Sequence, residues 1–292
     1  MFSFRFRTRV AVIVGLLTLP LRNIAVSCVG SLRYTVDRFD SVTIDSHSLS
    51  SNSQEFSEQL RSSLAEWKAS KYKGVWLKLM DSHASLIPQA LELGFQFHSA
   101  EKGCVLLSNW LPNSESKLPL GATHQVGVGA IVFNANREML VVKERSGPLR
   151  DLKVWKMPTG LSNPGEYIPA AVEREVAEET GIDCKFKGVL AFRQANSAVF
   201  QKTDLFFVCL LSYDGLCTKP LNCQEDELVG CQWMSVDAYL NQPGLKSVTL
   251  HNLLSPIIVK AYQGQAELME ASEYQNVVPP IKALIFAPPQ DK

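Results

Sequence analysis

The sequence has no net charge, no repeat of fixed period and no C-x-x-C pair. Its 29 lysines and arginines balance 29 aspartates and glutamates over 292 residues. A neutral chain lacks the basic field with which proteins wrap DNA or RNA, and it lacks the acidic excess of disordered solvating chains. We therefore expect no nucleic-acid partner. The missing repeat excludes a solenoid or a propeller.

The seven cysteines are odd in number and match neither a disulfide framework nor a zinc site. Buried apolar surroundings suit free cysteine, which behaves there as a small hydrophobic side chain. We therefore predict buried, reduced thiols that fill the core. The cysteines are Cys28, Cys104, Cys184, Cys209, Cys217, Cys223 and Cys231.

Residues 1–36 differ in composition from the rest of the chain. They contain five arginines, and no aspartate or glutamate precedes Asp37. The apolar run VAVIVGLLTLPL is shorter than the roughly 20 residues of a membrane-spanning helix, so we expect no stable membrane span. An arginine-rich, acid-free segment predicts targeting to a mitochondrion or plastid. A secretory signal, indicated by the basic start and the small residues AVS, stays open, as does a cytosolic chain whose first core strand begins here.

Residues 37–111 have the pattern of a small α+β domain. The stretch EFSEQLRSSLAEWKAS places Phe56 and Trp67 on one helical face, and GVWLKLM follows as a strand. A second helix is predicted at SLIPQALELG, with Pro88 in its first turn, before two strands around the turn EKG. The polar, proline-bounded residues 112–123 are predicted to form a linker.

Residues 124–264 alternate strands with helices. The segments HQVGVGAIVF and MLVVKE, joined by NANRE, predict a hairpin, and further strands are expected at FKGVLAFRQ, TDLFFVCLLSY and ELVGCQWM. Ser235 is suited to cap a helix at VDAYL, and LLSPIIVKAYQG predicts a later, partly broken helix. This order predicts an α/β/α sandwich built on a mixed sheet. Residues 265–292 show no clear element.

The stretch GLSNPGEYIPAAVEREVAEETGI gathers four glutamates on one short predicted helix, which Gly181 is expected to end. Residues three and four apart share a helix face, so Glu175 lies beside Glu178 and Glu179. Like charges so placed cost stability unless a cation compensates them. Arg174, on an adjacent strip, can brace one carboxylate. A hard divalent cation is the natural compensation, because it prefers oxygen ligands.

The same stretch fits the pattern G-x5-E-x7-R-E-U-x-E-E-x-G-U, where U is aliphatic, at every defined position. A solvated acidic helix face does not explain this spacing. The sequence therefore resembles the Nudix hydrolases, whose signature this is. The matching residues are Gly160, Glu166, Arg174, Glu175, Val176, Glu178, Glu179, Gly181 and Ile182.

This resemblance implies a Nudix fold whose loop and helix hold Mg²⁺ or Mn²⁺ against a diphosphate. Glu175 and Glu179 resemble the principal metal ligands of the family, and Glu178 belongs to the same cluster. The carbonyl of Gly160 is a further candidate ligand, and Arg174 resembles the orienting arginine. The implied reaction is hydrolysis of a nucleoside diphosphate linked to a second group, X, by water that a carboxylate deprotonates.

The general base stays open at this point. Glu178 is one candidate, and the loop CQEDEL offers Glu225, Asp226 and Glu227 shortly before a strand. In some relatives an acid from this region contacts metal or activates water. Glu166 resembles the loop glutamate of the signature, with a structural role or an outer-sphere contact to metal.

Basic and aromatic residues around the signature are candidates for binding the substrate. Arg193, Lys156 and Lys143 are able to meet phosphates, although a surface charge is the alternative for each. Trp155 and Phe133 are able to stack on adenine, although core packing is the favoured alternative for both.

The resemblance extends to an N-terminal pre-Nudix domain. GVWLKL, LGFQFHSAEKG, SNWLP, HQVGVGAIVF, VWKMPTG and AFRQANSAVFQKTDLFFVCLL resemble the plant and animal Nudix group that carries this domain, over residues 32–240. The group implies that residues 37–111 have an acetyltransferase-like shape. The chain lacks an R/Q-x-x-G-x-G/A turn for acetyl-CoA, so we expect no acetyltransferase activity.

Members of this group commonly cleave ADP-ribose or NADH to AMP and a phosphorylated remainder. The proline that often follows the signature in ADP-ribose pyrophosphatases is missing, as are SQPWPFPxS of one NADH pyrophosphatase class and LLTxR of coenzyme A hydrolases. Ala195 and Asn196 stand where similar sequences have a histidine after RQ. FAD, coenzyme A and dinucleoside polyphosphates therefore stay open as substrates. A weakly active nucleotide-sensing or regulatory binding protein and a homodimer also stay open.

Overall fold

The computed structural model describes residues 22–25, 32–146, 150–196, 201–213, 220–275 and 281–289, the first of these as backbone alone. These residues belong to two compact units. Unit 1 runs up to Ala122, and unit 2 begins at Thr123 and includes the last two strands.

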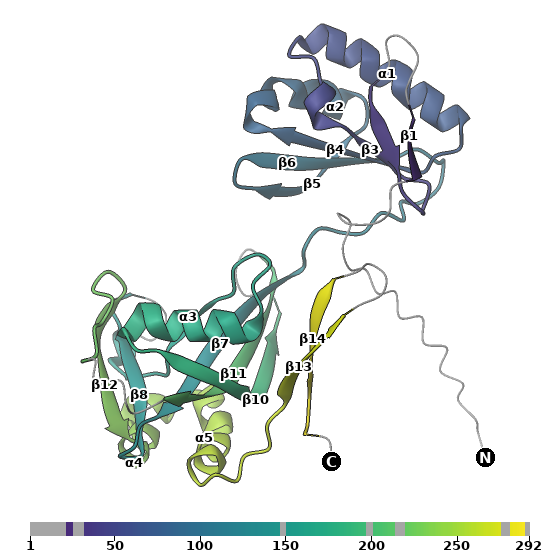
Figure 1. Cartoon of the computed structure of the whole chain (residues 1–292). Helices are drawn as coiled ribbons and strands as arrows, with labels where there is room; N and C mark the ends of the chain where they lie inside the picture. Colours follow the sequence, from purple (N-terminus) through teal and green to yellow (C-terminus); the bar gives the residue numbers. More distant parts are fainter. Residues whose placement is uncertain are drawn as a thin grey trace, which may run out of the picture. The chain divides into compact units, whose positions relative to one another are not determined.

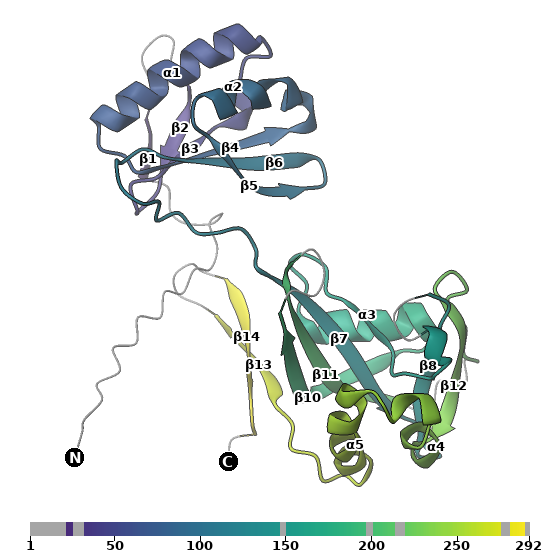
Figure 2. The ribbon, with the colours of Figure 1, turned by 180° about the vertical axis from the view of Figure 1, so that it is seen from behind.

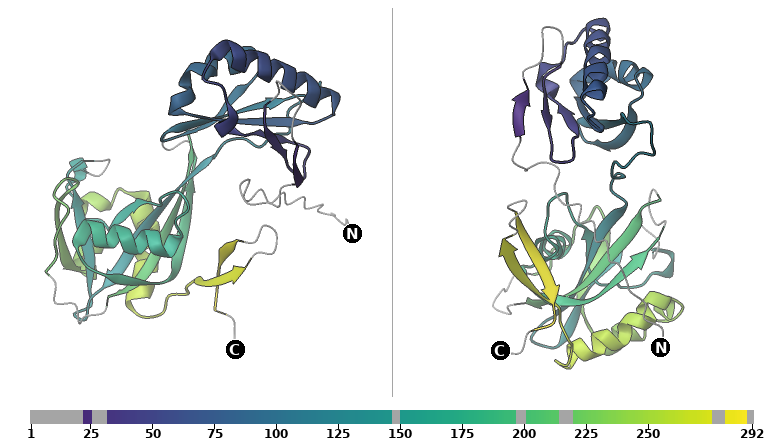
Figure 3. Two further views of the ribbon diagram at one scale, coloured as in Figure 1. Left: turned by 45° about the horizontal axis from the view of Figure 1, so that its top comes forward. Right: turned by 90° about the vertical axis from the view of Figure 1, so that its right-hand side faces the viewer.

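Unit 1 is a six-stranded sheet of order β1-β2-β3-β4-β6-β5, with helices α1 and α2 packed on one face (Figure 3). Strands β3 and β4 are parallel, and the other neighbours are antiparallel. Asn52 caps α1 by accepting hydrogen bonds from the backbone N–H groups of Gln54 and Glu55. The helix buries Phe56 and Trp67 against the sheet, as its apolar spacing predicts. The helices and strands are β1 (Arg22–Ala25), β2 (Tyr34–Val36), β3 (Val42–Ile44), η1 (Ser46–Ser48), α1 (Ser53–Ala69), β4 (Gly74–Met80), η2 (Asp81–Leu86), α2 (Ile87–Glu92), β5 (Gln96–Glu101) and β6 (Cys104–Trp110).

Residues 32–36 form part of unit 1, whereas the sequence placed them in the targeting segment. Leu32 and Tyr34 are buried in its core, and the Tyr34 ring packs edge-on against Trp67 with 5.1 Å between ring centroids. This alternation of apolar residues belongs to a strand, so the structured unit begins before the predicted boundary. Within the described ranges no helix is long and apolar enough to cross a membrane. The remaining residues of the expected targeting segment, 1–21 and 26–31, lie outside the described residues.

Unit 2 is a mixed sheet of order β10-β11-β7-β8-β12, with β9 also beside β7. Strands β7 and β11 are parallel, and the other neighbours are antiparallel. Helix α3 packs on one face, seen in front in Figure 1, and α4 and α5 pack on the opposite face, seen in front in Figure 2. The predicted α/β/α sandwich is confirmed. Its elements are β7 (His124–Phe133), β8 (Glu138–Glu144), η3 (Arg150–Leu152), β9 (Thr159–Leu161), α3 (Ile168–Thr180), β10 (Cys184–Ala195), β11 (Thr203–Tyr213), β12 (Leu228–Ser235), α4 (Val236–Leu240), η4 (Pro243–Leu245), α5 (Thr249–Tyr262), β13 (Glu270–Gln275) and β14 (Lys282–Ala287).

Strand β7 changes partner along its length. It pairs with β8 at Phe133, next to the predicted hairpin turn, and with β9 at Gly127, Val128 and Gly129. Strand β9 therefore lies in the sheet, with Gly160 beside Glu175 of the acidic helix α3.

Two C-terminal predictions are wrong. Helix α5 continues through Pro256, although a break was expected there. The tail predicted to be without elements forms the antiparallel hairpin β13–β14. Phe286 packs edge-on against Phe186, and Met269 forms a β-bridge with Val189 of β10. The polar segment EASEYQ has no strand signal of its own. The hairpin is instead held by these contacts with residues distant in the chain, which the sequence does not reveal.

The prediction of reduced cysteines is wrong for one pair. Cys223 and Cys231 form a disulfide, with 5.7 Å between their Cα atoms. The chain before β12 turns back on this strand, which brings together two cysteines eight residues apart. Cys104 and Cys209 are free, and burial raises the pKa of Cys209 to about 12.

Candidate active site

Helix α3 sets the direction in which the clustered glutamates face. Pro169 lies in its first turn, and Gly181 ends it with a left-handed φ of 73°, as predicted. Ala171, Val172 and Val176 pack into the core. The glutamates of the signature consequently lie on the remaining sides of the helix, some of them against β9.

Arg174 joins the loop to the helix. Its Nε and Nη2 donate hydrogen bonds to the two carboxylate oxygens of Glu166, at 2.8 and 2.9 Å. Its Nη1 donates to Glu175 at 2.8 Å and to Glu178 at 2.9 Å, and Nη2 also donates to the carbonyl of Leu161 at 2.9 Å. The planar guanidinium thus fixes three carboxylates and the end of β9 in one arrangement.

Glu166 is held in its charged form. The bidentate hydrogen bond from Arg174 and the backbone N–H of Asn163 outweigh partial burial and lower its pKa to about 2. It therefore braces the loop as a permanent anion at neutral pH.

Strand β9 passes so close to α3 that a side chain at position 160 has no room. A Cβ atom added to Gly160 would lie 1.9 Å from the carboxylate carbon of Glu175 and 2.0 Å from its Oε2. Any other residue at this position must displace the Glu175 carboxylate. Burial raises the pKa of Glu175 against the opposing effect of Arg174. The Gly160 carbonyl oxygen lies toward β7, 3.6 Å from the position of a Cβ on Gly127.

Glu179 is the most deeply buried carboxylate of the signature, with 4% of the residue exposed. Its Oε2 accepts a hydrogen bond from the backbone N–H of Thr159 at 3.2 Å. Burial is the main cause that raises its pKa to about 7, and Glu175 and Glu227 raise it further, while Lys156 opposes the shift. The charged form of Glu179 is therefore destabilised, and a cation would favour it.

The three predicted metal ligands, Glu175, Glu178 and Glu179, have different surroundings in the structure. Glu178 is bound to Arg174 with 54% of its side chain exposed, Glu175 lies against Gly160, and Glu179 is buried beside Thr159. In the described part of the chain, no group of three or more His, Cys, Asp or Glu side chains is arranged to hold a metal ion. Glu175 and Glu179 are nevertheless close enough to repel each other's charge. A buried and a partly buried carboxylate so placed fit a hard divalent cation.

The loop before β12 closes the C-terminal end of α3. The backbone N–H of Asn222 donates to the carbonyl of Thr180 at 2.9 Å, and that of Gln224 donates to the carbonyl of Glu179 at 3.3 Å. The disulfide of Cys223 fixes the same loop to β12. The helix end that carries Glu179 is therefore capped by a cross-linked loop.

The three acids of this loop are placed differently. Glu227 lies near enough to Glu179 to raise its pKa. Glu225 and Asp226 have exposed side chains, and the carbonyl of Glu225 accepts a hydrogen bond from Nε of Arg145 at 2.9 Å. Glu227 is thus the loop carboxylate that the structure brings to the signature.

Comparison with known proteins identifies the family. The chain matches the Nudix hydrolase domain at residues 32–111 and the NUDIX domain at residues 123–251. It is 43% identical to Nudix hydrolase 2 of Arabidopsis thaliana over 212 residues, which is 73% of this chain and 75% of the relative. The chain belongs to the Nudix hydrolase family. It is therefore a hydrolase, as the signature predicted.

The family likeness extends to animals. This Nudix hydrolase is 35% identical to the nucleoside diphosphate-linked moiety X motif 6 protein of Homo sapiens over 217 residues, which is 70% of the chain and 66% of the relative. The crystal structure of the MutT protein from Methanosarcina mazei Go1 is 20% identical, with a TM-score of 0.38, and covers 50% of this chain and 98% of its own.

Lys156 precedes the Nudix signature and was predicted to meet a phosphate. Its Nζ forms an ion pair with Glu144 at 2.7 Å and donates a hydrogen bond to the hydroxyl of Thr159. Lys156 lowers the pKa of Glu179 but has no ion pair with it within 4.0 Å. Its side chain is 13% exposed, so Lys156 lies inside the Nudix site and faces protein groups.

Arg193 lies on the other side of Gly160, at the end of β10. It forms an ion pair with the buried Asp204 and lies over the Phe206 ring, 5.4 Å from its centroid. Its side chain is 40% exposed. Asp204 and the Gly160 carbonyl both lie within 4 Å of one point, the position of a Cβ on Gly127. Arg193 therefore lies beside the Nudix loop, where Asp204 and Phe206 hold its guanidinium while part of the side chain is exposed to solvent.

The two candidate stacking residues are engaged with protein. Trp155 lies under Lys143, with 5.7 Å between Nζ and the ring centroid. Phe133 packs edge-on against Tyr262 of α5, with 5.7 Å between ring centroids. Core packing was the stated alternative for both, and their contacts agree with it.

Sequence reasoning missed Glu144 and Asp204. Neither belongs to the Nudix signature, and each meets its basic partner only after strands have paired. Lys156 forms a β-bridge with Val142, which brings it beside Glu144 two residues further along β8. For Glu144, the available signal was its place at the end of the predicted strand MLVVKE, whose pairing decides which basic residue lies beside it.

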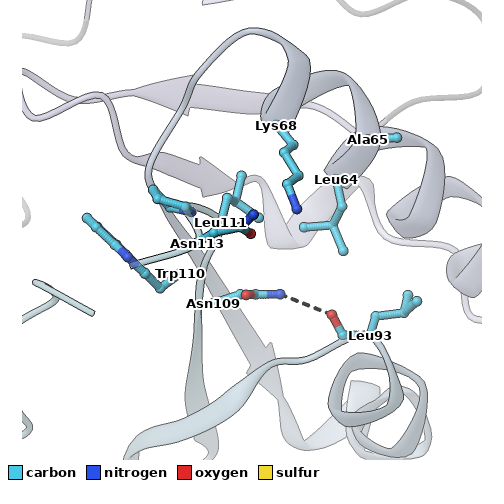
Figure 4. A pocket seen from close by; sticks show the side chains of 9 residues that line it. Leu64, Ala65, Lys68, Leu93, Asn109, Trp110, Leu111 and Asn113 are labelled. Carbon is cyan, nitrogen blue, oxygen red and sulfur yellow. Dashed lines mark hydrogen bonds between the residues drawn. The ribbon is translucent and has the colours of Figure 1, made fainter. Parts of the chain in front are cut away.

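A hollow of about 360 Å³ lies in unit 1, whereas the signature belongs to unit 2 (Figure 4). Lys68 points into it, and Nδ2 of Asn109 donates to the carbonyl of Leu93 at 3.0 Å on its wall. It contains one cation and no carboxylate, so its chemistry does not suit metal-dependent hydrolysis. Its lining consists of Leu64, Ala65, Lys68, Leu93, Asn109, Trp110, Leu111, Pro112 and Asn113.

Proposed function

We propose that this Nudix hydrolase cleaves the pyrophosphate bond of a nucleoside diphosphate linked to a second group, with ADP-ribose and/or NADH as substrates and AMP as a product. The observation that carries the proposal is the pair of carboxylates beside β9, the partly buried Glu175 at Gly160 and the buried Glu179 at Thr159. Both have raised pKa values because burial disfavours their charged forms. A chain that only packs a helix has no need of such a pair.

The proposed cation is Mg²⁺ or Mn²⁺, held by Glu175 and Glu179, with Glu178 and the Gly160 carbonyl as further candidate ligands. When bound, it would polarise the diphosphate and offset the negative charge that develops on its oxygens. The chain supplies the positioning. Thr159 N–H holds Glu179, and Arg174 holds Glu175.

We propose Glu227 as the general base ahead of Glu178 and Glu225. Glu178 is engaged by Arg174, and Glu225 has an exposed side chain and a backbone carbonyl that binds Arg145. Glu227 lies close to Glu179 and has an exposed side chain that can take a proton from water. Glu227→Gln should lower kcat with little change in KM, whereas Glu225→Gln should change neither. A larger loss of kcat in Glu178→Gln would transfer the role to Glu178.

Arg193 is the proposed contact for a phosphate of the substrate. It is a half-exposed cation fixed by Asp204 beside the Nudix loop. Arg193→Gln should therefore raise KM while the affinity for Mn²⁺ stays unchanged.

The test is a substrate panel. Purified protein is incubated with Mg²⁺ or Mn²⁺ and ADP-ribose, NADH, FAD, coenzyme A, diadenosine polyphosphates or dNTPs, and products are separated by chromatography. Release of AMP from ADP-ribose or NADH, absent in Glu179→Gln and after EDTA treatment, supports the proposal. Cleavage of another member of the panel instead would show that the group linked to the nucleoside diphosphate is a different one. If no member is cleaved above the variant, the alternative of a nucleotide-sensing binding protein replaces the enzyme proposal for these substrates.

For the cellular address we propose a mitochondrion or plastid, supported by the acid-free, arginine-rich start. The Cys223–Cys231 disulfide is more typical of an oxidising compartment and favours the secretory alternative. A fluorescent reporter fused to residues 1–36 tests the proposal, and cytosolic or secreted fluorescence would contradict it.

A further inference from the structure

Glu144 lies at the end of β8, outside the Nudix signature, and pairs with Lys156, which Thr159 links to the buried Glu179. Its Oε1 lies 2.7 Å from Nζ of Lys156, and the two side chains are 22% and 13% exposed. Its Oε2 is buried with no hydrogen-bond partner among the described residues. A half-satisfied, largely buried ion pair is an unfavourable element of a core unless it serves the neighbouring site.

The backbone holds this pair in place from two sides. Lys156 exchanges backbone hydrogen bonds with Val142 of β8, at 2.8 and 2.9 Å. The preceding residue, Trp155, is clamped by Gln242, which accepts from its N–H at 2.7 Å and donates to its carbonyl at 3.0 Å. The position of the Lys156 stem is therefore fixed, and its ammonium group has a choice of nearby partners.

The ammonium group binds Glu144 and Thr159 in preference to Glu179. Lys156 donates to the Thr159 hydroxyl, and the N–H of the same Thr159 donates to Glu179. Lys156 and Glu179 are thus separated by a single residue, yet they form no ion pair. A free lysine this close to a buried carboxylate would pair with it.

Resting on the metal dependence proposed above, we propose that Glu144 is a positioning residue of the metal site: it retains Lys156 and so keeps Glu179 available to the cation. Lys156 on this view acts on the protein and is not a phosphate ligand. Glu144 also balances the charge of Lys156, which would otherwise repel a divalent cation.

The proposal predicts different changes in Mn²⁺ affinity for two neutralising substitutions. Glu144→Gln releases a positive charge toward Glu179 and should weaken Mn²⁺ binding by about tenfold. Lys156→Met removes the competing cation and should bind Mn²⁺ at least as tightly as the wild type. The double variant E144Q/K156M leaves no lone buried charge and should bind Mn²⁺ within about threefold of the wild type.

The experiment measures Mn²⁺ binding to the full chain without substrate, by electron paramagnetic resonance of free Mn²⁺, together with KM at saturating metal. Thermal melting confirms that each variant is folded. If Lys156→Met does not fold, the comparison of Glu144→Gln with the double variant still shows whether Lys156 is the group that weakens Mn²⁺ binding. Asp40→Asn is the matched control, because the Asp40–Lys73 pair has the same 2.7 Å separation in unit 1.

Five outcomes are distinguishable. Weaker Mn²⁺ binding in Glu144→Gln, together with Mn²⁺ binding at least as tight as the wild type in Lys156→Met, supports the proposal. Unchanged Mn²⁺ binding in Glu144→Gln overturns it, and so does a tenfold rise of substrate KM in Lys156→Met with unchanged Mn²⁺ binding, because Lys156 is then a phosphate ligand. Wild-type protein that binds Mn²⁺ but cleaves no substrate contradicts the proposed function alone. Wild-type protein that binds no Mn²⁺ overturns both.

Discussion

The two units of this Nudix hydrolase are built alike but treat buried charge differently. Each packs helices on a mixed sheet around an apolar core. Among the described residues, the buried polar side chains of unit 1 are Ser41 and Ser63, whereas unit 2 buries Glu179, Thr180, Asp204 and His251. Unit 1 places its Asp40–Lys73 ion pair at the surface, whereas unit 2 has largely buried pairs beside the signature, such as Glu144–Lys156, besides the exposed pair Glu273–Lys282.

Burial of charge costs free energy unless partners or ligands offset it. A core made of apolar residues, as in unit 1, is the less costly arrangement for the same architecture. The unit that retains buried carboxylates is therefore the one in which chemistry is expected. This difference can be tested by substitutions made in both units.

The largest expected effect separates a buried glutamate from an exposed one. Glu179→Gln removes a proposed metal ligand and should lower kcat/KM by about 10³-fold. Glu58→Gln makes the same change on the exposed face of α1 in unit 1 and should leave kcat/KM unaltered. Steady-state kinetics with the preferred substrate measures both. Equal losses in the two variants would remove the distinction between the units.

The next effect is the pH dependence of stability in metal-free protein. The pKa of Glu179 rises from its ordinary 4.5 to about 7 on folding, so the folded chain holds this proton more tightly than the unfolded chain. Its stabilising contribution is complete below pH 4.5 and is lost as the pH rises through 7, on the order of 3 kcal/mol. Urea unfolding in EDTA at pH 5 and pH 8 measures the loss.

Two controls sharpen that measurement. Glu179→Gln should remove the loss, and saturating Mg²⁺ should reduce it because a bound cation favours the carboxylate. Glu166 acts in the opposite direction, because its lowered pKa contributes stability that is lost as the pH falls toward 2. A loss between pH 5 and pH 8 that persists in Glu179→Gln would assign it to another group.

A smaller effect comes from the arginine that joins loop and helix. Arg174→Lys cannot reproduce the bidentate bond to Glu166 together with the bonds to Glu175 and Glu178. It should lower the free energy of unfolding of unit 2 by about 2 kcal/mol and reduce kcat as well. Chemical denaturation measures the first, and Arg61→Lys on α1 is the control in unit 1. Wild-type stability in Arg174→Lys would show that the network adds nothing to folding.

The disulfide is expected to affect stability about as much as Arg174→Lys, with no effect on the signature itself. Reduction of Cys223–Cys231 frees a short loop and should lower the stability of unit 2 by about 2 kcal/mol. Differential scanning calorimetry with and without a thiol-free reductant detects the shift, and Cys223→Ser with Cys231→Ser should reproduce it without reductant. Cys104→Ser, which changes a free cysteine of unit 1, should leave the reductant-dependent shift of unit 2 unaltered. An equal shift of both units would mean that the reductant acts elsewhere.

The parts of the fold that were predictable are those with a local signal. The acidic helix was found from the spacing of its glutamates and from Gly181, because the left-handed backbone at the helix end favours glycine. Strand β4 was found from a continuous apolar run, and α1 from its apolar stripe. Gly160 was recognised from the signature, but its reason, contact with the Glu175 carboxylate, needed the structure.

The parts that were missed depend on contacts between distant residues. Cys223 meets Cys231 because a loop folds back on β12, and their spacing alone does not show this. The β13–β14 hairpin is secured by Phe286 and Met269 against β10, not by its own composition. Lys156 was predicted to meet phosphate because nothing in its local sequence reveals Glu144 as its partner.

The backbone bonds from Asn222 and Gln224 to the end of α3 also set an order of assembly. During synthesis the whole signature leaves the ribosome before this loop does, so helix α3 first emerges with the carbonyls of Glu179 and Thr180 uncapped. Domains generally fold as units once enough chain is available. A nascent chain that ends before Gln224 would therefore contain every residue of the signature and still lack the finished helix end that carries Glu179.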